Sequence, residues 1–301
     1  MNGVHAAIVT QFDSDLRVAH QAVAEQVRRL IDGGIHGIVP NGTVGEGGSL
    51  SRDERRSVIE TAVAAAAGRV PVCAGVSAPS AEQAAAYARD AKTAGADGVM
   101  TLPPLQYRAD RRELLAFFGE VARAADLPVM VYNNPVASGS DLQPELLASI
   151  VREIPPVTAL KESSGDARRI AELVNLCPET DVMVGGDDWA LEGFCAGASG
   201  WVSGVAVVLP SESVRLWELC AAGELAAARE LYAALLPLAR LDMTPKLVQY
   251  FKAALDEIGL VGGPCRPPRL MLDEDELATL RAATAQAVEY APPGFPRLSP
   301  A

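Results

Sequence analysis

The feature that most constrains the fold is an alternation of short β-branched runs with longer alanine-rich segments of helical periodicity. The candidate strands cover residues 6–10, 37–40, 70–76, 98–102, 129–132, 158–161, 182–184 and 200–202. Eight such strands separated by seven helical segments indicate βα units with a parallel sheet. No GxGxxG follows the first strand, which disfavours an open dinucleotide-binding sheet. We therefore expect a closed (β/α)₈ barrel, the TIM-barrel architecture.

The alternation stops after the eighth strand. Helical patterns then follow one another without strands, at residues 211–221, 224–242, 245–258 and 273–290. We expect the first of them to complete the barrel. The others can form a further small element, because 301 residues leave room for one beyond a barrel. The sequence therefore predicts an α/β barrel at residues 1–222 and a C-terminal helical domain at residues 223–301, with a Pro-rich tail from residue 292.

Composition limits the kinds of binding partner and the cellular compartment that we expect for this protein. A net charge of −12 without a basic run disfavours nucleic-acid binding. No apolar stretch is long enough to span a membrane, and the first ten residues lack the layout of a secretory signal, so we expect a cytoplasmic protein. The five cysteines form no CxxC pair, and the three histidines all precede residue 37. We therefore expect free thiols and no metal site.

Lys161 is the first candidate for chemistry, because reactive groups in such barrels sit at the carboxyl ends of the strands. The chain uses lysine only at positions 92, 161, 246 and 252 and otherwise prefers arginine. Burial at the end of an apolar strand would disfavour the ammonium and favour a free amine that attacks a carbonyl carbon. The alternative is a lysine that pairs with Glu162 or Asp187, and position alone does not separate the two interpretations.

Tyr132 ends the neighbouring strand and is the candidate acid–base partner. Formation and collapse of a carbinolamine require proton transfers, and no histidine follows His36 to perform them. A phenol beside the amine could relay these protons. The alternative is an aromatic residue at the barrel rim whose hydroxyl satisfies a backbone group.

The glycine-rich loop at residues 42–48 could direct backbone N–H groups and the Thr43 hydroxyl at an anion. A substrate carboxylate is the anion that suits a Schiff-base enzyme, whereas phosphate is weakly supported because the loop is not a Walker sequence. A tight βα turn is the alternative. Asp187 and Asp188 are adjacent and point in different directions, so we expect them to cap the following helix rather than bind a metal.

Taken in order, these motifs resemble the dihydrodipicolinate synthase and N-acetylneuraminate lyase family over nearly the whole chain. The shared landmarks are Gly42-Thr43-Val44-Gly45-Glu46, Tyr132-Asn133-x-Pro135, Lys161-Glu162-Ser163-Ser164-Gly165, Gly185-Gly186-Asp187-Asp188 and the helix that carries Lys252. The resemblance implies a homotetramer that works through a lysine Schiff base without a cofactor. It also implies that Lys161 forms the Schiff base, Tyr132 relays protons and Thr43 holds the keto-acid carboxylate.

Three departures from the synthase concern the substrate. The resemblance implies a second threonine where this chain has Val44, and an arginine for the second substrate's carboxylate where it has Ala137. The tyrosine that reaches in from a neighbouring subunit is displaced by one position, with Gln106 in the expected place and Tyr107 after it. These departures argue against dihydrodipicolinate synthesis.

A closer resemblance is to the branch of the family that deaminates 1-pyrroline-4-hydroxy-2-carboxylate in hydroxyproline breakdown. The shared segments are residues 132–135, 161–169, 200–204, 236–249 and 266–270. We expect a small 2-keto acid or cyclic imine as the substrate. Its predicted contacts, besides Lys161 and Tyr132, are Gly42, Thr43, Val44, Asn134, Ser203 and Tyr107, with Asn133 and Ser163 as further candidates for hydroxyl groups.

The expected reaction is deamination with dehydration. Lys161 would attack the imine carbon and open the ring; loss of an α proton and of the 4-hydroxyl would then lead to ammonia and 2-oxoglutarate semialdehyde. The sequence does not identify the acid that protonates the leaving hydroxyl. The alternatives are a 2-keto-3-deoxy sugar acid dehydratase, a pyruvate-dependent aldolase or synthase, and a non-catalytic barrel that binds a ligand.

Overall fold

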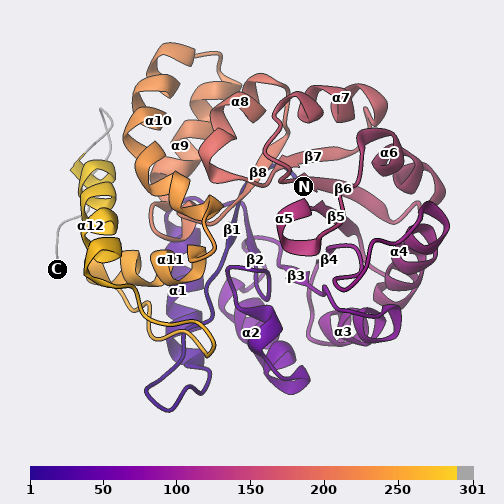
Figure 1. Cartoon of the computed structure of the whole chain (residues 1–301), viewed down its shortest axis with the longest axis horizontal. Helices are drawn as coiled ribbons and strands as arrows, with labels where there is room; N and C mark the ends of the chain where they lie inside the picture. Colours follow the sequence, from indigo (N-terminus) through magenta and orange to yellow (C-terminus); the bar gives the residue numbers. More distant parts are fainter. Residues whose placement is uncertain (290–301) are drawn as a thin grey trace.

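The computed structural model describes residues 1–289 and has eight parallel strands surrounded by helices (Figure 1). The strands are β1 (Gly3–Ala7), β2 (Gly37–Val39), β3 (Cys73–Gly75), β4 (Gly98–Thr101), β5 (Val129–Asn133), β6 (Val157–Glu162), β7 (Asp181–Val184) and β8 (Gly200–Ser203). They pair in the order β2-β1-β8-β7-β6-β5-β4-β3. A parallel bridge between Ile38 and Val72 joins the two ends of this order, so the sheet closes. The predicted (β/α)₈ barrel is confirmed.

Helices follow the strands and cover the outside of the barrel (Figure 1). They are α1 (His20–Asp32), α2 (Arg52–Ala66), α3 (Ala81–Thr93), α4 (Arg111–Ala125), α6 (Pro144–Glu153), α7 (Arg168–Leu176), α8 (Ala190–Cys195) and α9 (Pro210–Ala221). Two of them begin with a capping box, formed by Ser51 with Glu54 before α2 and by Asp110 with Glu113 before α4. The short helix α5 (Pro135–Ser138) and the 3₁₀ turns η1 (Gly47–Ser49), η2 (Asp187–Trp189), η3 (Val205–Val207) and η4 (Arg240–Met243) were not predicted.

The first strand lies three residues earlier than predicted. β1 covers Gly3–Ala7, whereas the β-branched side chains of Ile8 and Val9 favoured residues 6–10. Parallel pairing with β8 begins at Gly3, and pairing with β2 ends at Ala7. The β-branched run therefore lies at the carboxyl end of the strand, beside the barrel mouth.

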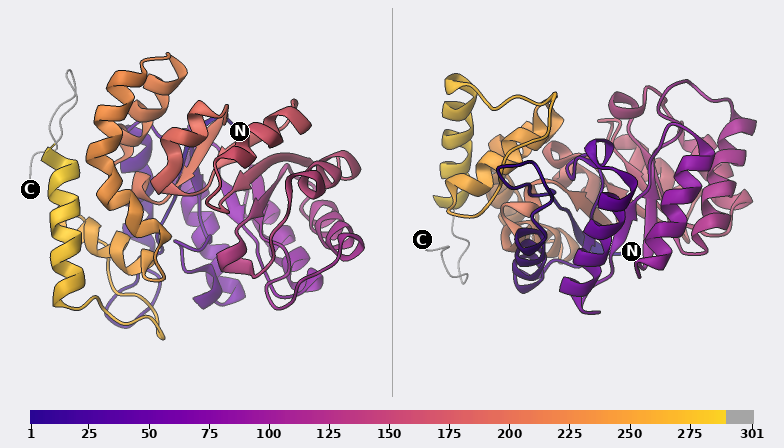
Figure 2. Two further views of the ribbon diagram at one scale, coloured as in Figure 1. Left: turned by 45° about the horizontal axis from the view of Figure 1, so that its top comes forward. Right: turned by 90° about the horizontal axis from the view of Figure 1, so that it is seen from below.

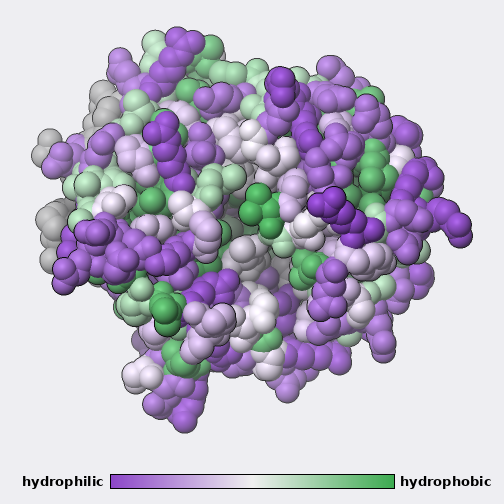
Figure 3. All heavy atoms as spheres, in the orientation of Figure 1, coloured by the Kyte–Doolittle hydropathy of each residue, from purple (hydrophilic) through white to green (hydrophobic). Residues whose placement is uncertain are grey.

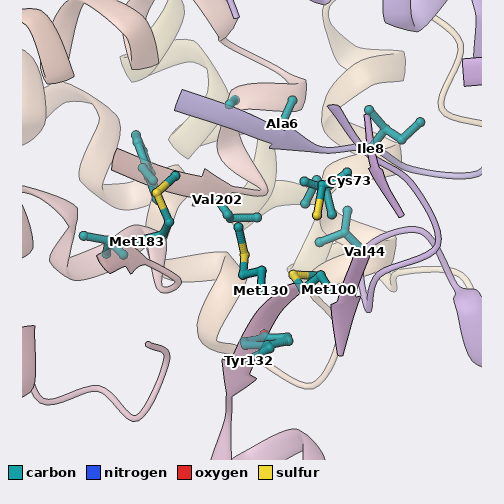
Figure 4. Packing of buried hydrophobic residues seen from close by; sticks show 14 of the residues in the cluster. Ala6, Ile8, Val44, Cys73, Met100, Met130, Tyr132, Met183 and Val202 are labelled. Atoms are coloured by element: carbon teal, nitrogen blue, oxygen red, sulfur yellow. The ribbon is translucent and has the colours of Figure 1, made fainter. Parts of the chain in front are cut away.

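Sulfur-containing side chains fill the barrel interior (Figure 4). Met100, Met130 and Met183 point inward from β4, β5 and β7, together with Cys73 from β3, and all four are nearly inaccessible to solvent. Unbranched thioethers adapt to irregular space, which suits a barrel whose other interior residues are small. Tyr132 lies two residues beyond Met130 on β5 and so faces the same way, one layer nearer the carboxyl ends.

Three helices that follow the barrel gather on one side of it (Figures 1 and 2). They are α10 (Leu225–Ala239), α11 (Leu247–Glu257) and α12 (Glu274–Glu289), and they confirm the predicted run of C-terminal helices. The domain boundary at residues 222/223 remains a prediction, and the predicted tail from residue 292 lies outside the described residues. Within residues 1–289, no helix is both long and apolar enough to cross a membrane.

The end of α10 directs the chain back over the barrel. Pro237 lacks an N–H and cannot bond to the carbonyl four residues earlier, at Ala233. Gln286 of α12 donates to that Ala233 carbonyl at 3.2 Å, which ties the two helices together. The regular helix ends at Ala239 rather than at the predicted residue 242, and the tighter turn η4 follows. This turn carries Asp242 to the barrel mouth.

Candidate active site

A cavity of about 310 Å³ opens at the carboxyl ends of the strands. Its walls come from the strand ends, the loop after β2, α5 and the segment from η4 to the start of α11. Figure 3 shows this face of the molecule hollowed near its centre. Of the predicted contact residues, those that line the cavity are Lys161, Tyr132, Gly42, Thr43, Val44, Asn134 and Ser163. The volume suits a small-molecule ligand.

Lys161 and Tyr132 lie side by side at the top of the barrel. They are paired in register on β6 and β5, so their side chains leave the sheet in the same direction. The Lys161 amine lies 4.2 Å from the centroid of the Tyr132 ring. Both side chains are at least nine-tenths buried, with 7 % of Lys161 and 5 % of Tyr132 exposed. An amine and a phenol thus meet in a confined space that opens to the cavity.

Lys161 does not pair with an acidic residue. Within residues 1–289 its amine has no hydrogen-bond acceptor and no carboxylate within 4.0 Å. Glu162 instead accepts from Asn133 Nδ2 at 2.9 Å and from the Ser164 N–H at 2.5 Å. The alternative of a lysine held by Glu162 or Asp187 is therefore not what the structure contains, and the amine is free to react.

Gly185 gives Lys161 its space. A Cβ at this position would lie 2.8 Å from Lys161 Cε and 1.8 Å from Ser163 Oγ. Any other residue at the end of β7 would displace both side chains from the cavity. Ser163 is 3 % exposed, and its hydroxyl has no hydrogen-bond partner in the described part of the chain. A buried hydroxyl without a partner is costly, so this group is suited to bind a polar atom of a ligand.

Asn134 orients the hydroxyl of Tyr132. The Asn134 Oδ1 accepts from the Ala137 N–H at 2.9 Å at the start of α5, which assigns its Nδ2 as the donor to Tyr132 Oη at 2.8 Å. With one lone pair of the phenol oxygen occupied by this donor, its proton remains available to another acceptor. The arrangement fits proton relay better than a rim tyrosine that satisfies a backbone group.

The loop after β2 presents free backbone donors to the cavity. Across the described residues, the N–H groups of Thr43 and Val44 have no hydrogen-bond acceptor, whereas the N–H groups of Glu46 and Gly47 bond back to the Thr43 and Gly42 carbonyls. Thr43 is exposed to the cavity and Val44 is buried. Successive free N–H groups beside a hydroxyl are suited to bind an anion, and the carboxylate site predicted from the sequence stays a prediction.

This loop is fixed from beneath. Thr10 Oγ1 donates to the Gly45 carbonyl at 2.7 Å, and Arg55 donates to the Gly47 carbonyl at 2.5 Å. Glu46 has a left-handed φ of 52° and is fully buried, where it accepts from Lys252 of α11 at 2.6 Å. The free N–H groups are therefore preorganised before any ligand arrives.

Asp187 has a structural role that differs from the predicted one. It does not cap the helix that follows; its side chain accepts from the Val205 N–H at 2.6 Å and the Gly204 N–H at 3.3 Å. These bonds join the end of β7 to the turn after β8. Burial raises the pKa of Asp187 well above its ordinary value. No cluster of three or more metal-ligating side chains occurs in residues 1–289.

Three predicted contact residues lie outside the cavity lining. Asn133 is fully buried and donates to Glu162 at 2.9 Å. Ser203 is fully buried at the end of β8, where its hydroxyl accepts from the Ala206 N–H at 3.0 Å. Tyr107 is on the surface, with 51 % of its side chain exposed. In their place, the cavity is lined by Asp242, which the sequence did not single out. It lies in the segment 236–249, on which part of the predicted resemblance to the deaminase branch rests, yet no sequence signal showed that this side chain faces the barrel mouth.

The model of the dihydrodipicolinate synthetase family matches residues 1–287 of the chain. The chain belongs to this family. It is 34 % identical over 283 residues to the 4-hydroxy-tetrahydrodipicolinate synthase of Methanopyrus kandleri, which covers 93 % of this chain and 94 % of that protein. The predicted family is confirmed, and the chain is an enzyme of a lyase family.

Solved structures agree with this assignment. The 4-hydroxy-tetrahydrodipicolinate synthase of Methylacidiphilum fumariolicum matches with a TM-score of 0.92 at 28 % identity, over 96 % of each chain. YagE of Escherichia coli K12, a prophage protein of the same family whose crystal structure is a complex with pyruvate, matches with a TM-score of 0.90 at 26 % identity. That match covers 95 % of this chain and 98 % of YagE.

Proposed function

We propose that Lys161 forms a Schiff base with a small 2-keto acid or cyclic imine carboxylate, and that the substrate is 1-pyrroline-4-hydroxy-2-carboxylate. The observation that carries this proposal is the unpaired, buried Lys161 amine beside Tyr132, in a cavity that also holds the free N–H groups of Thr43 and Val44. The amine attacks the carbon next to the carboxylate while the loop holds the carboxylate.

Ring opening follows from the attack. The C–N bond to the ring nitrogen breaks, and Tyr132 gives its proton to the leaving amine, so that an iminium remains between Lys161 and the substrate. The Tyr132 phenolate then removes a proton from the α carbon, and the iminium accepts the electron pair as an enamine. Loss of the 4-hydroxyl as water leaves a C3=C4 double bond conjugated with the iminium. Transfer of protons from C5 and its amine to C3 and C4 then turns the C5 amine into an imine, and hydrolysis of this imine and of the Schiff base yields ammonia and 2-oxoglutarate semialdehyde.

The cavity walls favour this substrate over the pair used in a synthase reaction. Of the described residues that line the cavity, Lys161 is the one basic side chain, and the Schiff base commits it to the reacting carbon. Val44, Val136 and Ala137 are apolar members of the cavity lining. A second carboxylate would therefore have no cation to bind, whereas an uncharged hydroxyl or amine could be accommodated.

The names of the relatives support the main alternative, which is 4-hydroxy-tetrahydrodipicolinate synthesis. The two reactions are separated by offering each substrate set to the wild-type enzyme. Ammonia release from 1-pyrroline-4-hydroxy-2-carboxylate, absent in Lys161→Ala, supports the deaminase. Condensation of pyruvate with aspartate semialdehyde, without ammonia release from the pyrroline, would show that the enzyme is a synthase and not a deaminase.

Two further parts of the proposal are that the enzyme is a homotetramer and that it works in the cytoplasm without a cofactor. The tetramer is tested by sedimentation equilibrium of the full chain. Dialysis against a chelator, with retained ammonia release, tests whether a metal is required. A monomer, or activity lost on chelation and restored by a metal, would contradict the corresponding part.

A further inference from the structure

The proposed elimination needs an acid, and neither Lys161 nor Tyr132 is available to act as one. Hydroxide is a poor leaving group, so breaking the C–O bond requires a proton on the oxygen. Tyr132 is committed to the amine and the α carbon in the proposed mechanism. Among the described residues that line the cavity, the remaining side chain with an ionisable proton is Asp242.

The fold places the Asp242 carboxyl at the cavity, close to the carboxyl ends of the strands. The turn η4 packs against η2, and the Asp187 N–H donates to Asp242 Oδ2 at 3.4 Å. Gly204, after β8, lies against both the Phe251 ring and the carboxyl, since a Cβ there would be 2.4 Å from Phe251 and 3.1 Å from Asp242 Oδ1. Gly185 and Gly204 follow the adjacent strands β7 and β8, and both line the cavity beside Lys161 and Asp242.

The surroundings favour a protonated carboxyl. Burial raises the pKa of Asp242 to about 6, with the nearby Asp188 acting in the same direction and the charge of Lys161 opposing it. Asp187 is also buried against η4 and is itself inclined to hold a proton. A carboxyl of this kind can give up a proton near neutral pH and regain it from solvent between turnovers.

A second observation indicates that a polar ligand atom belongs in this part of the cavity. The Ser163 hydroxyl is buried, lines the cavity and lacks a partner in residues 1–289, and it lies against Gly185. Such a group is normally hydrogen-bonded in a folded protein. A substrate hydroxyl or amine would satisfy it, in the same chamber as Lys161 and Asp242.

We propose that Asp242 is the general acid that protonates the hydroxyl leaving from the carbon β to the Schiff-base carbon. The enamine electron pair forms the new C=C bond, the β C–O bond breaks, and its electrons remain on the oxygen, which takes the Asp242 proton and departs as water. Lys161 is left as an iminium and Asp242 as a carboxylate. This inference rests on the proposed elimination chemistry and names the residue that completes it.

The test uses Asp242→Asn in the full-length enzyme, with Asp188→Asn as the matched control. Asp188 is the adjacent half-buried carboxyl and does not line the cavity. We expect Asp242→Asn to slow ammonia release from 1-pyrroline-4-hydroxy-2-carboxylate by about 10²–10⁴-fold. The borohydride-trapped adduct and the exchange of α protons with deuterium should both persist, because those steps precede the loss of hydroxide.

A change of leaving group separates an acid from a structural role. Fluoride departs without prior protonation, so the 4-fluoro analogue should react in Asp242→Asn within about tenfold of the wild-type rate. An equal slowing of the fluoro and hydroxy compounds, or loss of the trapped adduct, would overturn the assignment of Asp242. Equal slowing in Asp188→Asn would do the same.

Failure of the substrate assignment is recognised separately. The wild-type enzyme could dehydrate a 2-keto-3-deoxy sugar acid but not the pyrroline, and need Asp242 for that reaction. This result would refute the pyrroline as the substrate and support Asp242 as the general acid. Elimination from neither compound by the wild type would overturn both proposals.

Discussion

Two buried lysines of this barrel have nearly the same burial and opposite surroundings. Lys161 is 7 % exposed and Lys252 is 2 % exposed, and each amine lies over an aromatic ring, at 4.2 Å from Tyr132 and 4.5 Å from Phe12. Lys252 donates to Glu46 at 2.6 Å and to the Pro264 carbonyl at 2.8 Å. Lys161 has no such partner in the described chain and faces a cavity. The two lysines therefore differ in their partners rather than in their burial, and this difference is why we propose Lys161 and not Lys252 as the nucleophile.

The rings beneath the two amines differ in the same sense. Tyr132 brings a hydroxyl that Asn134 orients, whereas Phe12 brings none. The first lysine thus lies beside the hydroxyl that we propose as a proton relay and faces a cavity, whereas the second has a carboxylate that holds it in place. Lys252 joins α11 to the loop that presents the free N–H groups of Thr43 and Val44, so its role is to position the anion site.

Replacing the two lysines in turn should separate their roles most strongly. Lys161→Met is expected to lower kcat by about 10⁴-fold or more, because no covalent intermediate can form. Its fold should persist, since the amine makes no hydrogen bond that methionine would break. Steady-state ammonia release and circular dichroism check both points, and substantial turnover by this variant would show that the chemistry lies elsewhere.

Removing the hydroxyl of Tyr132 leaves Lys161 over a plain phenyl ring, as Lys252 is over Phe12. Tyr132→Phe should reduce kcat by about 10²–10⁴-fold while the KM for the substrate changes little, because the relay is lost and the carboxylate site is not. Single-turnover kinetics should place the delay in adduct formation. If Tyr132→Phe formed the adduct at the wild-type rate, the relay would have to be assigned to another group.

Removing Lys252 leaves the Glu46 carboxylate buried without its cation. Lys252→Met should destabilise the protein by about 3–5 kcal/mol, as expected when one partner of a buried ion pair is deleted. It should also raise KM, since the loop would lose its anchor. Denaturant unfolding measures the first effect and initial rates the second. The double variant Lys252→Met/Glu46→Gln should recover much of the stability, and a single variant as stable as wild type would contradict the role of the pair.

The smallest expected effect is the dependence of folding stability on pH that the Asp242 carboxyl causes. Its pKa is raised to about 6 in the folded protein, so folded molecules bind more protons than unfolded ones between that value and the ordinary value for aspartate. Stability from this group is present at low pH and is lost as the pH rises through about 6. Asp242→Asn should therefore gain a few degrees in Tm at pH 8 and nothing at pH 4. A variant less stable than wild type at pH 8 would indicate that the carboxylate is favourable there.

Local patterns were sufficient to predict the barrel and the pair at its centre. The β-branched runs gave the strands, and the positions of Lys161 and Tyr132 at two strand ends indicated that they would meet. The free N–H groups near Thr43 also followed from a glycine-rich turn after a strand. Each of these features depends on residues whose direction is set by the strand they occupy.

Features that depend on distant segments were beyond the sequence. Glu46 and Lys252 are 206 positions apart, and no local pattern links them. Asp242 was hidden because it was predicted as the last residue of a long helix, whereas in the structure it lies in the turn η4 that follows Pro237 and lines the cavity. Ser203 was misjudged for the opposite reason: its strand end is at the rim, yet its side chain turns into the wall.

The most direct test of the contrast between the two lysines is peptide mapping after borohydride reduction. The wild-type enzyme is incubated with pyruvate, or with 1-pyrroline-4-hydroxy-2-carboxylate, reduced, digested and analysed by mass spectrometry. One reduced adduct on the peptide that contains Lys161, with Lys252 unmodified, is the predicted result. An adduct on Lys252, or no adduct with either compound, would contradict the assignment of Lys161 as the nucleophile.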